Sequence, residues 1–306
     1  MKKVICCYHH TKLVIESWEE YRIFEEELRK FLKNVDTHPK IREALEYILS
    51  AGGKRIRPII ALISGKLCGG SYKRLMNFAI AGELLHTASL VHDDIIDRAN
   101  LRRNSLPIHV KYGEEFAIVF GDWLISKAIE LLSIYGEEVI RDSAFAGLKM
   151  CEGELIDIYS KTSEFGEEEY FECIEKKTAY AFAYSAKIAC KIVCKDSEAM
   201  ENLQNYGLSL GIAYQLVDDL LEYLEVLDEK RSQLESLTLP QLYEKKFGKE
   251  KAIKEILRLI SVFAEKSKEY LASFPDCEEK RKLERIVDIM TFEMLEKRLP
   301  IPELSK

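Results

Sequence analysis

The chain has 306 residues, of which 45 are Lys or Arg and 52 are Asp or Glu, so its net charge is −7. A hydrophobic content of 47% with 32% charged residues excludes a disordered chain, and the mild acidity argues against a nucleic-acid partner. Only 15 Gly and 7 Pro are present, too few for the turns of a β-sandwich, barrel or propeller.

Apolar residues recur at helical spacing along almost the whole chain, and no segment alternates as a β-strand does. The pattern predicts helices at 15–34, 39–50, 55–68, 72–96, 106–110, 114–134, 137–160, 167–193, 196–226, 237–245, 249–271 and 278–297. Since no shift in composition divides the chain, we expect one all-α domain over residues 1–306, with 1–14 as an N-terminal arm.

No apolar run is long enough to cross a membrane. The longest runs, Ile59–Ser64 and Ala179–Ala186, are far shorter than the roughly 18 residues that a spanning helix needs. Lys2 and Lys3 precede an apolar run that ends by Tyr8, which is too short for the core of a signal peptide. We therefore expect a cytoplasmic protein without a transmembrane segment.

Eight cysteines are present, at positions 6, 7, 68, 151, 173, 190, 194 and 277. Their spacing forms no paired Cys-x-x-Cys framework, and Cys190 and Cys194 lie in an apolar helical pattern where small buried thiols are common. The segment Cys6–His10 (CCYHH) could bind a soft metal, although adjacent ligands cannot easily close a tetrahedral site. We expect an unliganded N-terminal arm here.

Three acids are concentrated near the end of one predicted helix, in the segment 92–97 (HDDIID). Asp93 and Asp97 are four residues apart, so their carboxylates share a helix face, and Asp94 lies beside them. Like charges at this spacing repel, and they gain nothing in stability unless a cation bridges them. Oxygen ligands with open positions suit Mg²⁺, which shares its coordination sphere with phosphates. Taken alone, the motif could equally be a solvated helix end.

A second acidic turn, in the segment 214–222 (YQLVDDLLE), again places acids at i, i+1 and i+4. These are Asp218, Asp219 and Glu222. The preceding Gly207 and Gly211 would let another helix approach closely. Two facing acidic turns in a helical bundle can form a polynuclear Mg²⁺ site, so the pair is stronger evidence than either turn alone.

Cationic residues accompany the acids. The segment 52–58 (GGKRIRP) places three cations at a predicted helix start, where backbone N–H groups and the helix dipole favour an anion. Arg102 and Arg103 follow the first acidic turn, and guanidinium groups suit phosphate oxygens. The structural alternatives are a solvated helix start at 52–58 and a surface pair at Arg102 and Arg103. For the other two residues they are a His86 in the core and a Lys177 whose aliphatic chain is buried while its ammonium group reaches water. Acids, cations and apolar helices together imply a diphosphate with a hydrocarbon tail.

These motifs resemble, in order, those of the trans-isoprenyl diphosphate synthases, the family of farnesyl, geranylgeranyl and polyprenyl diphosphate synthases. The resemblance covers roughly residues 20–245 and rests on GGKRIRP, DDIID followed after four residues by RR, GDWLISKA, GELIDI, KTAYAF and GIAYQLVDDLLE. It implies a helical bundle of the isoprenoid synthase type with a central active-site cavity. The implied activity is that of a prenyltransferase, the Mg²⁺-dependent condensation of isopentenyl diphosphate with an allylic prenyl diphosphate. A homodimer is also implied, with the apolar face of 116–132 as a candidate interface.

The resemblance also assigns roles to individual residues. The diphosphate of isopentenyl diphosphate would be held by four side chains: Lys54, Arg57, His86 and Arg103. Three Mg²⁺ ions would be ligated by Asp93, Asp97 and Asp218. The allylic diphosphate would be gripped with the help of Asp94, Asp219, Arg102 and Lys177, and Glu222 completes the second motif. Thr178 and Gln215 would direct oxygen dipoles at the developing allylic cation.

The length of the product depends on what lies beneath the first acidic turn. Ala88 and Ser89 stand five and four residues before Asp93, where short-product members of the family have a bulky aromatic residue. Because both are small, and because HTASL at 86–90 resembles longer-chain members, the resemblance implies an all-trans product longer than farnesyl diphosphate. The alternative is that another side chain closes the bottom of the product cavity and so forms its floor, with Leu85, Phe116 and Phe120 as candidates.

Two departures from the family pattern keep other hypotheses open. Glu222 stands where the family has Asp, and 223–237 is several residues short and lacks a Gly-Lys loop, for which Lys230 or Arg231 could substitute. The short loop favours a second hypothesis, a non-catalytic or regulatory subunit of a heteromeric synthase. A class I terpene cyclase is a third, but the second metal triad of that class is missing and the cations for isopentenyl diphosphate would be superfluous.

Overall fold

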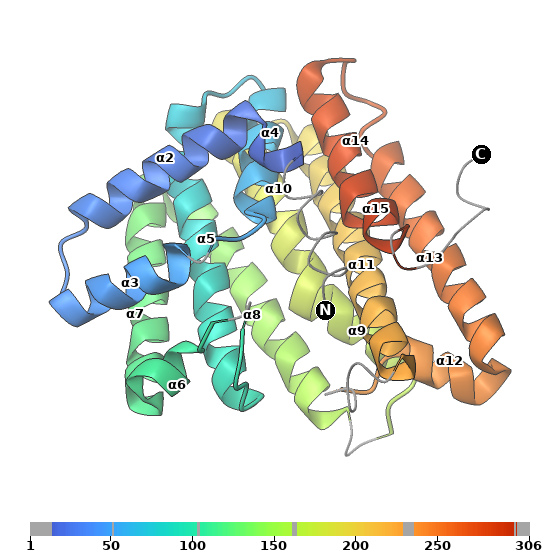
Figure 1. The fold of residues 1–306 in the computed structure, drawn as a ribbon. Coiled ribbons are helices and arrows are strands. Elements are labelled where there is room, and N and C mark those ends of the chain that lie inside the picture. Colours follow the sequence, from blue (N-terminus) through green and yellow to red (C-terminus); the bar gives the residue numbers. More distant parts are fainter. Residues whose placement is uncertain are drawn as a thin grey trace.

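A computed structural model describes residues 14–50, 52–102, 105–160, 164–228, 236–296 and 298. Among these residues the chain forms helices joined by turns, and its only β-pairing is an isolated bridge between Arg102 and Ser105. The helices are α2 (Glu19–Asn34), α3 (Pro39–Ser50), α4 (Ile56–Leu67), α5 (Tyr72–Ile96), α6 (Ile108–Tyr112), α7 (Glu114–Leu132), η1 (Ser133–Tyr135), α8 (Glu137–Tyr159), α9 (Glu167–Ile174), η2 (Glu175–Ala179), α10 (Tyr180–Val193), α11 (Ser197–Leu227), α12 (Leu239–Phe247), α13 (Lys249–Glu269), α14 (Glu278–Met290) and α15 (Phe292–Leu295) (Figure 1). The predicted all-α fold is confirmed.

Two predicted helices are interrupted. The helix predicted at 167–193 contains a π-helical turn, η2, between α9 and α10. Single π turns within helices often occur at functional sites, because the extra residue changes the direction in which side chains point. The helix predicted at 278–297 breaks at Thr291, where φ is −118° and ψ is −86°. The Thr291 hydroxyl donates to the carbonyl of Val287 at 2.7 Å, a local bond that competes with the helix.

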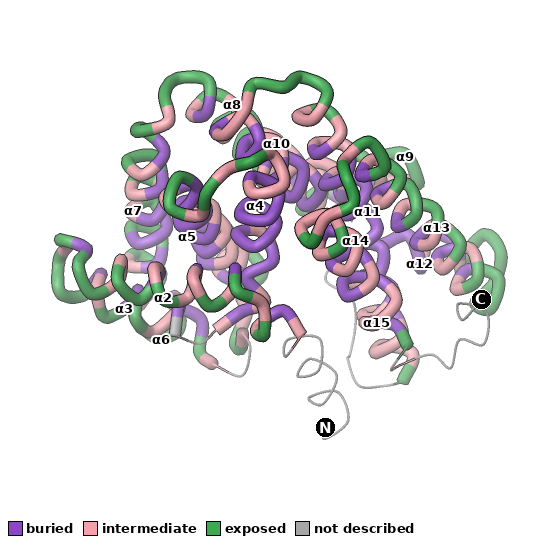
Figure 2. Tube along the Cα trace, turned by 90° about the horizontal axis from the view of Figure 1, so that it is seen from above, coloured by how far each residue is buried: buried purple, intermediate pink, exposed green. Residues whose placement is uncertain are grey.

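Helix α4 lies at the centre of the bundle, packed against α5, α10 and α14. Its residues from Pro58 to Gly65 are all buried, as expected for a helix that is apolar all round (Figure 2). Despite this apolar centre, every helix among the described residues is too short or too polar to span a lipid bilayer.

Helix α11 joins the two halves of the hydrophobic core. Its N-terminal half, including Leu203 and Leu210, packs in a cluster with α4, α5 and α7, and its C-terminal half packs with α9, α12 and α13. The close approach predicted at Gly207 and Gly211 is confirmed: a Cβ at Gly211 would lie 2.4 Å from Cα of Ala179. α11 therefore lies directly against η2 and α10.

Several predicted features lie outside the described residues. These are residues 1–13 of the N-terminal arm with the Cys6–His10 segment, Arg103 of the arginine pair, and Lys230 and Arg231 of the shortened loop.

Candidate active site

The first acidic turn lies at the C-terminal end of α5, and its three carboxylates have different surroundings. Asp93 is partly buried, Asp94 is 2% exposed and Asp97, the residue at which the helix ends, is exposed. Asp94 turns inward and accepts a hydrogen bond from Nε of Arg102. The backbone of Arg102 pairs with Ser105 through two 2.9 Å hydrogen bonds. Asp94 therefore positions Arg102 beside the acidic turn and is less available to a ligand than Asp93 and Asp97.

Asp93 faces charged residues from two other elements. Burial and the negative charge of Glu154 on α8 raise the pKa of Asp93 to about 7, while the charge of Lys177 opposes that rise and Asp97 adds to it. Carboxylates are thus crowded together with too little positive charge to balance them. Such an environment favours the binding of a cation.

Lys177, in the π turn η2, bridges two acids of α8. Its Nζ lies 2.8 Å from Oε2 of Glu154 and 2.6 Å from Oδ2 of Asp157. Burial acts to lower the pKa of Lys177, but the charges of the two acids outweigh it and raise the pKa. Gly153 permits this contact, because a Cβ there would lie 2.3 Å from the backbone nitrogen of Lys177.

Glu154 and Asp157 were not predicted as site residues, although the GELIDI segment contributed to the family resemblance. The signal that could have identified them is a pair of acids three residues apart in an otherwise apolar stretch, which puts both on one helix face. Figure 1 shows α5, α8 and α11 ending at the same end of the bundle, where these acids lie.

The second acidic turn, on α11, belongs to a chain of hydrogen bonds. The hydroxyl of Thr178 donates to Oε1 of Gln215 at 2.7 Å, and Nε2 of Gln215 donates to Oδ1 of Asp219 at 2.8 Å. Oδ2 of Asp219 accepts from the hydroxyl of Tyr170 at 2.5 Å. Burial raises the pKa of Asp219 to about 7, although its two hydrogen bonds act to lower it.

Asp219 and Asp218 differ in burial and are therefore suited to different roles. Asp219 is 7% exposed and uses both oxygens in hydrogen bonds to protein groups, so it positions Gln215. Asp218 and Glu222 are less buried than Asp219 and lie on the same helix at i and i+4. Of the second acidic turn, Asp218 and Glu222 are therefore more accessible to a metal ion than Asp219.

A cationic pocket of about 70 Å³ lies at the start of α4. Nη1 of Arg57 lies 3.2 Å from Nε2 of His86, and the guanidinium group lies 4.8 Å from the ring centroid of Phe182. Lys54 lines the same pocket, with its Nζ 5.9 Å from the ring centroid of Tyr214. Three of the four residues predicted to hold one diphosphate are thereby brought together, and the fourth, Arg103, is not described.

Arg55, the middle cation of GGKRIRP, has a structural role. It is 4% exposed, has a positive φ of 50°, and pairs with Glu25 at 2.9 Å and with Glu83 at 2.5 Å. Its Nη2 also donates to the carbonyl of Leu49 at 2.7 Å. Arg55 therefore anchors the turn that presents Lys54 and Arg57 to the pocket.

The residues of the acidic turns fit a hard divalent cation. Among the described residues, no three acidic side chains bring ligand atoms within 4.8 Å of one another. The carboxylates Asp93, Asp97 and Asp218 offer oxygen ligands only, and such ions commonly take one or two carboxylates and complete their coordination with water and substrate phosphates. These acids would thus hold metal together with a diphosphate.

The residues beneath the first acidic turn differ in exposure. Ala88 is 1% exposed and belongs to the core, whereas Ser89 is partly exposed and donates to the carbonyl of His86 at 2.9 Å. Ser89 precedes Asp93 by one helical turn, so it lies on the wall that leads away from the acids. Phe116 and Phe120 stack at 5.9 Å between ring centroids, and Phe120 is fully buried.

Comparisons with known proteins show which family this chain resembles. The Polyprenyl synthetase family model matches residues 38–258. The geranylfarnesyl diphosphate synthase of Methanosarcina mazei is 43% identical over 92% of this chain and 95% of its own length. The geranylgeranyl diphosphate synthase of the same organism is 34% identical over 83% of this chain and 90% of its own length.

Solved structures give the same result. A geranyltranstransferase from Methanosarcina mazei superposes with a TM-score of 0.81 at 40% identity, over 92% of this chain and 99% of that chain. A polyprenyl synthase from Caulobacter crescentus, complexed with calcium and isoprenyl diphosphate, superposes with a TM-score of 0.78 at 28% identity. That match covers 88% of this chain and 94% of the Caulobacter chain.

Proposed function

Because this chain belongs to the polyprenyl synthetase family and is a prenyltransferase, as its sequence predicts, we propose that it condenses isopentenyl diphosphate with an allylic prenyl diphosphate. The observation that best supports the proposal lies along α5. His86, in contact with Arg57, stands two helical turns from Asp93, or about 10 Å along the helix. A cationic site and an acidic site at this separation suit two diphosphates, one of which is bound through metal.

The acidic site would receive the allylic diphosphate. Lys177 and Arg102 would contact its oxygens directly, and Asp93, Asp97 and Asp218 would hold Mg²⁺, for which we propose three ions. When bound, Mg²⁺ would neutralise the charge that builds up on the diphosphate as its bond to carbon breaks. Lys54, Arg57 and His86, together with Arg103, would hold isopentenyl diphosphate in the cationic pocket.

As the allylic carbon–oxygen bond breaks, positive charge develops at C1 of the prenyl group. Thr178 and Gln215 would direct oxygen dipoles at this charge, and the hydrogen bond from Gln215 to Asp219 supports the required orientation of the amide. The double bond of isopentenyl diphosphate then attacks C1, and the proton lost from the condensed product passes to the released pyrophosphate. Apolar walls would keep water from the carbocation.

We also propose a product longer than farnesyl diphosphate. Ser89 is small and precedes Asp93 by one helical turn, so it would leave room beneath the acidic turn for a growing tail. The 43% identity to a geranylfarnesyl diphosphate synthase favours a product of that class.

Exposed apolar side chains support the proposed homodimer. Val119 and Ile129 on α7 are 60% and 50% exposed, and Leu148 on α8 is 64% exposed. Contiguous exposed apolar surface is typical of interaction sites, and we propose that α7 and α8 form such a surface. Sedimentation analysis should give a dimer for the native chain and a monomer for Val119→Asp, whereas Val262→Asp, at a 47% exposed position on α13, should remain dimeric. A monomeric native chain would exclude the homodimer. The cytoplasmic location stays a prediction.

The test of the reaction is incorporation of labelled isopentenyl diphosphate by the purified chain with an allylic primer, with Mg²⁺ or with EDTA. We expect incorporation that depends on both Mg²⁺ and primer. Primer binding without incorporation would support the alternative of a regulatory subunit of a heteromeric synthase. Release of pyrophosphate from the primer alone, with a cyclic hydrocarbon product, would support the terpene cyclase.

A further inference from the structure

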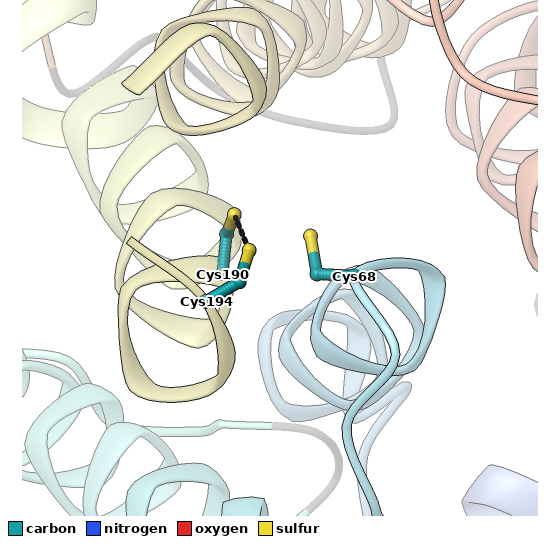
Figure 3. Close-up of side chains that lie close together, drawn as sticks. All are labelled: Cys68, Cys190 and Cys194. Carbon is teal, nitrogen blue, oxygen red and sulfur yellow. Dashed lines mark hydrogen bonds between the residues drawn. The ribbon is translucent and has the colours of Figure 1, made fainter. Parts of the chain in front are cut away.

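Three thiols from two helices converge away from the acidic turns. Cys68 ends α4, Cys190 lies in the last turn of α10, and Cys194 ends α10. Their sulfur atoms all lie within 4.8 Å of one another, and those of Cys190 and Cys194 are 3.5 Å apart (Figure 3). The described residues contain no other cluster of three potential ligands this compact.

The local sequence explains why the thiols meet. Cys190 and Cys194 are separated by one helical turn, so they share a face of α10. Gly70, just after Cys68, lets the end of α4 lie against the end of α10, because a Cβ at Gly70 would lie 2.3 Å from Cγ2 of Val193. The convergence therefore depends on contacts that residue spacing along the sequence does not reveal.

We propose that Cys68, Cys190 and Cys194 form a three-thiolate site for one soft metal ion of the Zn²⁺ class. Zinc–sulfur bonds of about 2.3 Å place neighbouring sulfur atoms about 3.8 Å apart in a tetrahedral site. The observed separations, 3.5 Å for one pair and at most 4.8 Å for the others, require only small side-chain movements to reach that geometry. Soft sulfur ligands select such ions over Mg²⁺.

A metal ion would have to displace thiol protons here, because a hydrogen bond with Cys68 and burial raise the pKa of Cys190. Burial raises the pKa of Cys194, but the backbone N–H of Asp196 donates to its sulfur and acts to lower that pKa. Hydrogen bonds of this kind from the protein support metal ligands. The Asp196 carboxylate caps α11 by accepting from the N–H groups of Glu198 and Ala199 at 3.0 and 3.2 Å. Since the cluster holds no fourth ligand among the described residues, water would take the fourth position.

The site would have a structural role. α4 presents Arg57 at its start, and α10 follows the turn that contains Lys177, so both helices lead from the active site to the thiols. From Arg57 to Cys68 the distance along the helix is about 16 Å. An ion at the thiols would cross-link the far ends of these two helices and stabilise the folded state against unfolding.

The experiment is equilibrium dialysis of the reduced full chain against Zn²⁺, followed by metal analysis and by thermal unfolding with and without Zn²⁺. We expect one bound ion per chain and a higher Tm with Zn²⁺. The bound ion and the rise in Tm should both be lost in Cys68→Ser and in Cys190→Ala. Alanine is used at Cys190 because this position is buried and serine would place a hydroxyl in the core. The bound ion and the rise in Tm should both persist in Cys151→Ser, which alters an exposed cysteine on α8. Far-UV circular dichroism shows that each variant is folded.

The N-terminal Cys6–His10 segment is tested in the double variant Cys6→Ser/Cys7→Ser, which should still bind one ion. Loss of binding in this variant, with retention in Cys190→Ala, would assign the metal to the N-terminal segment and overturn the proposal. Absence of Zn²⁺ binding by the reduced native chain would overturn it equally. So would Zn²⁺ binding that leaves the Tm of the native chain unchanged, because the cross-link would then be absent.

Discussion

The hydroxyl of Thr178 lies 2.7 Å from Oε1 of Gln215, although the two residues are 37 positions apart in the chain. The π turn η2 presents Thr178, and α11 presents Gln215, with the close packing at Gly211 bringing the two elements together. Because the amide nitrogen of Gln215 donates to Asp219, the amide oxygen has one favoured direction, toward Thr178. Two oxygen dipoles are thus held in fixed relative positions before any substrate binds.

The first prediction concerns the end of this hydrogen-bond chain. Tyr170→Phe removes the donor to a buried oxygen of Asp219, which should lower the free energy of unfolding by about 1–3 kcal/mol and slow elongation several-fold. Chemical denaturation and initial rates measure the two effects. Tyr243→Phe is the matched control, because its hydroxyl donates at 2.7 Å to Glu167, at the start of the helix that carries Tyr170, and not to Asp219. It should leave the rate nearly unchanged, and equal slowing in both variants would contradict the role assigned to Asp219.

The second prediction separates two adjacent lysines. Lys177→Gln removes the cation between Glu154 and Asp157, so the crowded carboxylates should repel an allylic diphosphate and turnover should fall by about 10-fold or more. Lys176→Gln breaks ion pairs with Glu152 and Glu172 on the surface and should change turnover by less than about twofold. Steady-state rates of both variants, measured as the concentration of the allylic primer is varied, test this prediction. Similar losses in both variants would remove the special role of Lys177.

The third prediction tests the packing of η2 against α8. A methyl group at Gly153 would lie 2.3 Å from the backbone of Lys177, so Gly153→Ala should displace the π turn, cost about 1–3 kcal/mol of stability and reduce turnover strongly. Gly147→Ala, in the same helix, meets nothing within 4 Å and should stabilise the protein by up to about 1 kcal/mol. Relative to the native chain, the melting temperature should fall in Gly153→Ala and rise in Gly147→Ala. Turnover should be lost only in Gly153→Ala. A fully active Gly153→Ala would show that the position of η2 is not critical.

The fourth prediction addresses product length. Ser89→Phe should shorten the longest product, because the new ring would stand beneath Asp93 on a partly exposed face of α5. Ala88→Phe, at a position that is 1% exposed, should instead destabilise the fold by about 1–3 kcal/mol through overpacking. Chromatographic sizing of dephosphorylated products, with Ser89→Ala as the control, distinguishes the two effects. An unchanged product from Ser89→Phe would point to a floor at Leu85, Phe116 or Phe120.

Helical periodicity and motif spacing were sufficient to predict the fold class and the residues that form the two acidic turns. They could not reveal the π turn at Glu175–Ala179, because one extra residue only shifts the phase of the apolar periodicity, and so short a segment is too brief to show that shift. They also treated Arg55 as one of three equivalent cations, whereas its pairing with Glu25 and Glu83 depends on segments distant in sequence.

The acids of α8 and the thiol cluster show the same limit. Glu154 and Asp157 become part of the site only because Gly153 admits η2, and Cys68 meets Cys190 only because α4 and α10 end together. Such contacts depend on how helices pack, and a single sequence specifies packing only indirectly. Residue types and spacing identify the chemistry of the site, whereas its positioning residues emerge from the tertiary structure.

The most direct test of the central claim is the length of the product made by the native chain alone. The purified protein would be incubated with isopentenyl diphosphate, Mg²⁺ and farnesyl or geranylgeranyl diphosphate, and the dephosphorylated products would be sized against all-trans standards. We expect elongation of both primers, to a product longer than farnesyl diphosphate. No elongation of farnesyl diphosphate, under conditions in which geranyl diphosphate is extended, would contradict it.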